Sequence, residues 1–187
     1  MKSIVILASG RGSNAERIIQ YFRKSKPQVH FSLITDRRTS GVFSIGERNG
    51  VPVEFISYTN MSQGQLEERL TELDPDFIVL AGFLRKIPPS VVRKFDGRMI
   101  NIHPSLLPKY GGKGMYGEHV HRAIIDAGEV ESGITIHYVN EEFDKGSFIA
   151  QFYCNVEPDD TLEDLRSKIQ KLEHRYYPFV IESLLES

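Results

Sequence analysis

Residues 4–23 read IVILASGRGSNAERIIQYFR, and this stretch decides the fold class. The apolar run Ile4–Ala8 predicts a buried strand, and the glycine-rich Ser9–Asn14 predicts a tight loop. Ala15–Arg23 then has apolar residues at helical spacing, so a helix is expected after the loop. A buried strand that turns through glycines into a helix is typical of a parallel sheet covered by helices on both faces.

The same alternation of short apolar runs and amphipathic stretches continues along the chain. The expected strands are Ile4–Ala8, Val29–Thr35, Val51–Ile56, Phe77–Ala81, Met99–His103, and an antiparallel pair at Gly133–Val139 and Phe148–Val156. The expected helices are Ala15–Arg23, Gly41–Asn49, Leu66–Leu73, His119–Ala127, and a long helix from Thr161 that a Thr161-x-x-Asp164 box caps and Pro178 kinks or ends. We therefore expect one α/β domain over residues 1–187: a Rossmann-like, mostly parallel twisted sheet of six or seven strands with helices on both faces.

Composition and charge limit what the chain can do. Its residues are 40% hydrophobic and 26% charged, values typical of a globular protein and unlike those of a disordered one. A net charge of −2 argues against a protein whose main role is to bind nucleic acid, because such proteins usually carry a basic excess. The single cysteine, Cys154, excludes an internal disulfide and suits a reducing compartment. The first apolar run is too short for a signal peptide or a membrane span, so we expect a cytoplasmic protein.

The glycine-rich loop supports three interpretations. Its Gly10–Ala15 spacing suits a phosphate, because the first turn of a helix presents unpaired N–H groups to an anion. The same spacing matches the loose form of the dinucleotide fingerprint, with Asp36 at the distance where an acidic residue would bind a ribose. The third interpretation is a tight turn without a ligand. Of these three interpretations, the residues of the loop favour a phosphate site.

A second polar group lies within Met99–Tyr110. Asn101 and His103 are two residues apart on an expected strand, so their side chains project from the same face. Ligands of open α/β sheets bind beyond the carboxyl ends of the strands, and an amide donor beside an imidazole suits a reaction that charges an oxygen while a proton moves. The alternatives are a capping asparagine with a structural histidine and, for Asp144 in the polar loop Val139–Gly146, a solvated turn residue.

Four segments relate the chain to a known family, in which they occur in the same order: Ser9–Asn14, Ala81–Arg85, Asn101–Tyr110 and Phe143–Gly146. With them the chain resembles the phosphoribosylglycinamide formyltransferases, folate-dependent enzymes of purine synthesis, from about Met1 to Tyr177. The sequence NIHPSLLP at residues 101–108 is specific to formyltransferases, and the G-x-G-S-N loop and Glu173-His174 point to this family among them. The resemblance implies a sheet of the formyltransferase type.

The resemblance also implies an activity: transfer of a formyl group from 10-formyltetrahydrofolate to the amine of glycinamide ribonucleotide, without a metal. Asn101 and His103 would stabilise the tetrahedral oxyanion, while Asp144 would favour the protonated form of His103 and relay the proton. The ribonucleotide would contact Arg11, Gly12, Ser13, Asn14, Gln170 and Glu173. The folate would contact Leu84, Arg85, Lys86, Ile87, Asn101, Asn140, Glu141, Glu142, Phe143 and Asp144. Neither nucleic acid nor a membrane is an expected partner, and the sequence predicts no oligomeric state.

The chain departs from the family pattern at two places. Met61–Gln65 lacks the arginine that members often use for folate, so the contact to the folate tail is not predicted. Gly111–Gly117 is longer than the usual linker and forms either a flap or an extended loop. By resemblance, the Leu107-Pro108 bond is a candidate cis peptide.

Three other activities fit parts of the pattern. Methionyl-tRNA formyltransferase and formyltetrahydrofolate deformylase share the Asn-x-His and Asp chemistry, but the first would need a C-terminal domain with a basic face and the second an N-terminal regulatory domain. A nicotinamide-linked oxidoreductase, built on Gly10–Asp36, is the alternative outside the formyltransferases. His121 and His137 fall in matching segments, and the sequence assigns them no chemistry.

Overall fold

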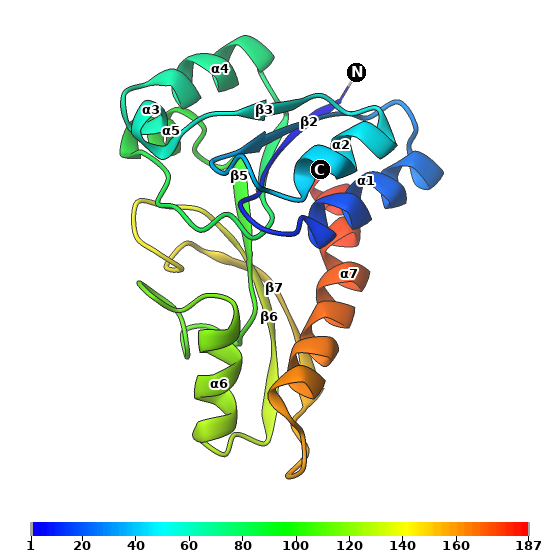
Figure 1. Cartoon of the computed structure of the whole chain (residues 1–187), viewed down its shortest axis with the longest axis vertical. Coiled ribbons are helices and arrows are strands. Elements are labelled where there is room, and N and C mark those ends of the chain that lie inside the picture. Colours follow the sequence, from blue (N-terminus) through cyan, green and yellow to red (C-terminus); the bar gives the residue numbers. More distant parts are fainter. Residues whose placement is uncertain (1, 187) are drawn as a thin grey trace.

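The computed structural model describes residues 2–186 and shows an α/β fold built on a seven-stranded sheet (Figure 1). The strands lie in the order β3-β2-β1-β4-β5-β6-β7. They are β1 (Ser3–Leu7), β2 (His30–Thr35), β3 (Val53–Phe55), β4 (Phe77–Leu80), β5 (Met99–His103), β6 (Glu131–Tyr138) and β7 (Phe148–Asn155). The pairs from β3 to β5 are parallel, whereas β5–β6 and β6–β7 are antiparallel. The predicted fold class and the antiparallel last pair are confirmed.

Helices connect the parallel strands and continue after β5 and β7. They are α1 (Ser13–Ser25), α2 (Val42–Asn49), α3 (Tyr58–Ser62), α4 (Gln65–Leu73), α5 (Pro89–Lys94), α6 (Glu118–Asp126) and α7 (Leu162–Glu186). The short helices α3 and α5 were not predicted, because one or two turns are too few to show a helical repeat of apolar residues. In Figure 1, α6 and α7 lie on opposite sides of the strand pair formed by β6 and β7.

The central strands bury both of their faces. In β1, Ile4 and Ile6 belong to one hydrophobic core, while Val5 and Leu7 belong to a second one. Residues of α1, α2, α6 and α7 complete the first core, and residues of α3, α4 and α5 complete the second. Because successive side chains of a strand point to opposite faces, a strand covered on both sides has to be apolar throughout. The uninterrupted run Ile4–Ala8 satisfies this requirement.

The long C-terminal helix confirms one expectation and corrects another. Thr161 and Asp164 form the predicted capping box, in which the Asp164 N–H donates to Thr161 Oγ1 over 3.2 Å and the Thr161 N–H donates to Asp164 Oδ2 over 2.9 Å. Of the two alternatives predicted for Pro178, a kink or an end of the helix, the end is wrong, because α7 continues through it to Glu186. Pro178 is buried, and buried residues such as Tyr177 and Ile181 pack on both sides of it, so tertiary packing holds the helix despite the missing N–H.

The sheet register brings the ends of four strands together. Leu7 of β1 pairs with Leu80 of β4, Leu80 pairs with Asn101 of β5, and Asn101 pairs with His137 of β6. The loops that leave β1 and β4 therefore begin beside Asn101 and His137, at the carboxyl ends of the parallel strands, where open α/β sheets bind ligands. The Leu107-Pro108 bond beyond β5 is cis, as predicted. Within residues 2–186, no helix is long and apolar enough to cross a membrane.

Candidate active site

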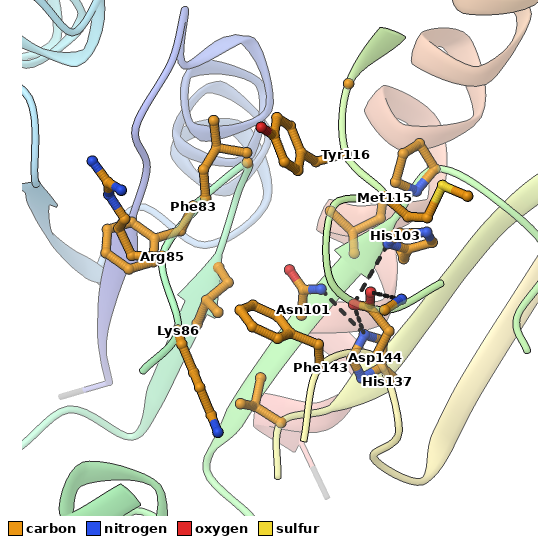
Figure 2. A pocket seen from close by; sticks show the side chains of 18 of the residues that line it. Phe83, Arg85, Lys86, Asn101, His103, Met115, Tyr116, His137, Phe143 and Asp144 are labelled. Carbon is orange, nitrogen blue, oxygen red and sulfur yellow. Dashed lines mark hydrogen bonds and ion pairs between the residues drawn. The ribbon is translucent and has the colours of Figure 1, made fainter. Parts of the chain in front are cut away.

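A cavity of about 1080 Å³ opens at this edge of the sheet (Figure 2). It is bordered by the loops that follow β4 and β6, by the end of β5, by residues 112–117 of the segment Gly111–Gly117 and by α7. The predicted site residues that line it are Arg11, Asn14, Leu84, Arg85, Lys86, Ile87, Asn101, His103, Asn140, Glu141, Glu142, Phe143, Asp144, Gln170 and Glu173. Gly12 and Ser13 are outside this lining, at the start of α1. The volume is at the upper end for small-molecule sites, so the cavity has room for two ligands.

Asn101 is held by a histidine of the neighbouring strand. Its Nδ2 lies 3.1 Å from Nε2 of His137, and Nδ1 of His137 lies 2.8 Å from the carbonyl oxygen of Tyr138. Since a carbonyl only accepts, Nδ1 carries the proton and Nε2 accepts from Asn101. The Asn101 amide has two hydrogens, so a second N–H is left for a ligand in the cavity.

His103 is almost fully buried, and its ring nitrogens face different partners. Nε2 lies 2.8 Å from the carbonyl oxygen of Tyr110 and therefore carries the proton, while Nδ1 lies 3.5 Å from Oδ1 of Asp144. Burial lowers the pKa of His103, and the opposing effects of the Asp144 charge and the Tyr110 carbonyl do not compensate for it. The Asp144 charge does favour the protonated form of His103, but desolvation outweighs it, so the net effect is a His103 pKa below its ordinary value.

Asp144 is not a solvated turn residue, since its side chain is only 11% exposed. It lies in the loop between β6 and β7 with a left-handed backbone, at a φ of 57°. Oδ2 accepts the N–H of Gly112 over 2.8 Å, and Oδ1 lies 3.7 Å from Nε2 of His137. Burial would raise the pKa of Asp144, but the contact with His137, the positive charge that His103 carries at the low pH where a carboxylate titrates, and the Gly112 N–H together hold this pKa below its usual value. The carboxylate is thus ionised beside His103.

The glycine-rich loop and α7 form one wall of the cavity. Asn14 Nδ2 donates to Glu173 Oε2 over 2.9 Å, and Gln170 Nε2 lies 3.4 Å from Ser13 Oγ. Burial raises the pKa of Glu173 to about 6, although the bond from Asn14 acts in the opposite direction. Helix α1 begins after Gly12 with no side-chain cap, so its first N–H groups are available to an anion.

Two loops face each other across the other side of the cavity. Figure 2 shows Arg85 and Lys86 on the loop after β4, opposite Phe143 on the loop after β6. Arg85 Nε donates to Asp36 Oδ2 over 3.0 Å, and the Asp36 side chain is fully buried. Oδ2 of Asp36 is paired with Arg85, Oδ1 has no hydrogen-bond partner among the described residues, and the side chain is closed to solvent, so Asp36 is not presented to a cofactor ribose and the support for the dinucleotide interpretation is weakened.

The comparisons with known proteins agree with this geometry. The family model described as formyl transferase matches residues 2–181. The chain belongs to the formyl transferase family. The phosphoribosylglycinamide formyltransferase of Bacillus subtilis (strain 168) is 36% identical to it over 191 residues, which cover 99% of this chain and 95% of the relative. The chloroplastic enzyme of the same name from Vigna unguiculata is 37% identical, and the chain spans 61% of its length.

Solved structures share the fold of this formyl transferase. The phosphoribosylglycinamide formyltransferase of Bacillus halodurans has a TM-score of 0.89 at 37% identity, covering 98% of this chain and 95% of that one. Glycinamide ribonucleotide transformylase 1 of Geobacillus kaustophilus has a TM-score of 0.89 at 32% identity, covering 99% of each chain. The predicted resemblance and the formyltransferase type of sheet are confirmed.

Two histidines of the formyl transferase have a place in the site that sequence reasoning did not assign. His137 orients Asn101 and approaches Asp144, and the signal for it was its position on an expected strand. His121 lines the cavity from α6 and is 5% exposed, and its Nδ1 has no hydrogen-bond partner. In the part of the chain that the structure describes, no group of three or more His, Cys, Asp or Glu residues is arranged to hold a metal ion.

Proposed function

We propose that this formyl transferase moves the formyl group of 10-formyltetrahydrofolate to the primary amine of glycinamide ribonucleotide, a step of purine synthesis. The observation that carries the proposal is the convergence of Asn101, His103 and Asp144 in one cavity with room for two ligands. An amide donor, a neutral imidazole and an ionised carboxylate are the groups that formyl transfer to an amine requires.

Asn101 stabilises the charge that forms on the formyl oxygen. The amine attacks the formyl carbon, which becomes tetrahedral, so that the oxygen gains a negative charge and the amine nitrogen a positive one. One N–H of Asn101 is bonded to His137, and the other donates to this oxygen. A preorganised donor of this kind contributes about 3 kcal/mol to transition-state stabilisation.

His103 and Asp144 move the proton. The neutral imidazole of His103 accepts the proton that the new ammonium loses, with Asp144 and a bound water as the relay. The Asp144 charge stabilises the imidazolium that forms, and the positive charge of this imidazolium in turn stabilises the oxyanion. The proton then passes to N10 of the folate as the carbon–nitrogen bond breaks, which gives tetrahydrofolate and the formylated ribonucleotide.

The two walls of the cavity divide the substrates between them. The ribonucleotide phosphate lies at Arg11–Asn14, where the first turn of α1 has no side-chain cap, and Gln170 and Glu173 contact the rest of this substrate. The pteridine lies against the backbone of Leu84–Ile87 and Asn140–Asp144. In this proposal Asn101, between the two walls, contacts the folate through the formyl group.

The proposal extends to the whole chain and its setting. Residues 1–187 act as one formyltransferase domain, since both cores of the described part pack against one continuous sheet. Its partners are the two small-molecule substrates. A single cysteine suits the reducing cytoplasm, and cell fractionation tests that location.

A direct assay tests the proposed function. The protein is supplied with 10-formyltetrahydrofolate and glycinamide ribonucleotide, and formylated ribonucleotide is measured by mass spectrometry. Product from the natural protein and from Asp159→Asn, an exposed loop aspartate, is expected, with much less from Asp144→Asn. Formate release without ribonucleotide would instead indicate a deformylase, and oxidation of NADH would indicate the oxidoreductase alternative. Either result without formyl transfer would contradict the proposal.

A further inference from the structure

The segment Gly111–Gly117 makes a contact with Asp144 that the proposed roles of Asn101, His103 and Asp144 do not explain. The backbone N–H of Gly112 donates to Oδ2 of Asp144 over 2.8 Å. The other oxygen, Oδ1, lies 3.5 Å from Nδ1 of His103 and 3.7 Å from Nε2 of His137. One oxygen of the carboxylate is therefore held by the backbone of Gly112. The other faces the imidazoles of His103 and His137 (Figure 2).

We propose that Gly112 is a positioning residue whose amide fixes the rotation of the Asp144 carboxylate, so that Oδ1 remains directed at His103 during proton transfer. The role rests on the proposed function, because only a proton transfer between Asp144 and His103 needs this orientation. Gly112 does not touch the reacting atoms in this proposal. It acts through Asp144.

Two adjacent glycines allow the backbone to approach the carboxylate. A Cβ on Gly111 would lie 2.4 Å from Leu107 Cδ2 and 3.4 Å from Asp144 Cβ, so a side chain there would push the segment away from Asp144. Gly112 has a φ of 96°, in the left-handed region, and its carbonyl accepts the N–H of Met115 over 3.1 Å. This turn leaves the N–H of Gly112 directed at Asp144, in a conformation that glycine adopts readily.

The orientation of the Asp144 carboxylate depends on such a contact, because the backbone of Asp144 does not itself fix this orientation. Its φ of 57° is unusual for a residue with a side chain, and such conformations persist where the surroundings impose them. Little of the side chain is open to water, so solvent does not readily replace a lost donor. A hydrogen bond from a backbone N–H to a carboxylate is charge-assisted and directional, and it therefore selects one rotation of the group.

A matched pair of glycine variants separates this contact from backbone strain. Gly112 and Gly64 have φ values of 96° and 103°, and a Cβ on either residue would meet nothing within 4 Å. Gly112→Ala and Gly64→Ala therefore introduce similar strain, but only the first disturbs a donor to Asp144. We expect Gly112→Ala to lower kcat by about ten- to a hundredfold with both KM values nearly unchanged, because misorientation affects the chemical step. Gly64→Ala keeps the natural kcat.

The pH midpoint of the His103 titration is a second measurement. It would not change if Gly112 had a purely structural role. Without the Gly112 donor the Asp144 charge is less stabilised, so the Asp144–His103 pair binds a proton more readily. The midpoint of the His103 NMR titration in the free protein is then expected at higher pH in Gly112→Ala, and at the natural pH in Gly64→Ala. This measurement needs no substrate, so its outcome is independent of whether the natural protein transfers formyl groups.

An amide-to-ester replacement at Gly112, made with glycolic acid, removes the N–H without adding a side chain. The proposal expects the same fall in kcat and the same upward shift of the His103 midpoint, in a protein whose circular dichroism is unchanged. A kcat within about twofold of the natural value, or a midpoint that does not move upward, would overturn the role of Gly112. Absence of formyl transfer by the natural protein, with the midpoint shifted in the variant, would instead overturn the proposed function.

Discussion

The amide of Asn101 and the imidazole of His137 lie 3.1 Å apart because β5 and β6 place the two residues directly opposite each other. The imidazole is itself tied to the backbone through the carbonyl of Tyr138. An unrestrained asparagine amide can rotate and present its oxygen instead of its nitrogen. In this structure His137 accepts from the nitrogen, so the donor side of Asn101 is selected before any substrate binds.

Replacing His137 tests this relationship. His137→Phe keeps a planar ring but removes the acceptor, so the Asn101 amide loses its orientation. We expect kcat to fall by about ten- to a hundredfold while both KM values change little, since the lost interaction acts on the oxyanion. His137→Gln retains an acceptor oxygen and is expected to recover part of the rate. Equal rates for the two variants would show that the acceptor has no role.

Asp144→Asn tests the carboxylate. The amide has nearly the same shape but carries no charge, so the pKa of His103, already lowered by burial, falls further. The fold and both substrate affinities are expected to stay largely intact, while kcat decreases by about 10²–10⁴-fold. His103→Asn should be similarly slow. The kcat of the double variant should fall by much less than the product of the two single-variant decreases, because the effects of groups that act as a unit are not additive.

The pH dependence of kcat/KM distinguishes this role of Asp144 from a structural one. In the natural protein the pair is active with Asp144 ionised and His103 neutral, and activity falls when His103 takes up a proton in the free enzyme. With the Asp144 charge removed, that fall is expected at lower pH. A variant that kept more than about half of the natural kcat across the pH range would contradict the relay.

The glycine-rich loop makes a prediction about substrate selectivity. A Cβ on Gly12 would lie 2.6 Å from Ile45 Cδ1 and 2.8 Å from Val42 Cγ1, and the residue has a φ of 79°. Gly12→Val therefore displaces the start of α1, and the ribonucleotide KM is expected to rise far more than the folate KM. Gly50→Ala, which introduces a side chain at another positive φ in open space, is the control. Equal increases in the two KM values would mean that the phosphate lies elsewhere.

The features that sequence reasoning predicted correctly are local ones. The run Ile4–Ala8 has to be apolar because both of its faces are covered, and Asn101 and His103 share a face because strand side chains alternate. The capping box at Thr161 and Asp164 likewise depends on residues within one turn. Each of these signals is contained in a few consecutive residues.

The features that it missed depend on packing between distant segments. The strand register that sets His137 against Asn101 is fixed only when β5 and β6 pair, and the Gly112 donor is a backbone group without a side-chain signal. The neutral state of His103 follows from burial, which the sequence does not state. Pro178 remains within α7 because the helix is packed on both sides of it.

Glu173 links substrate binding to stability. It lies on α7 and lines the cavity, where burial raises its pKa to about 6 from an ordinary value of 4.5. The folded protein therefore holds a proton on Glu173 more tightly than the unfolded chain does. Stability falls as pH rises from about 4.5 to about 6, and at higher pH the buried charge opposes folding in full.

Glu173→Gln removes this charge while keeping an oxygen that accepts from Asn14. Above pH 6 the free energy of unfolding is expected to rise by about 1–2 kcal/mol, and the gain should disappear as pH falls toward 4.5, where the natural residue is protonated as well. Urea unfolding at several pH values measures the difference, with Glu47→Gln as an exposed control. The ribonucleotide KM should rise in the same variant, because a carboxylate accepts hydrogen bonds from ribose hydroxyls more strongly than an amide does. A Glu173→Gln protein with natural stability at every pH would show that Glu173 does not carry a buried charge.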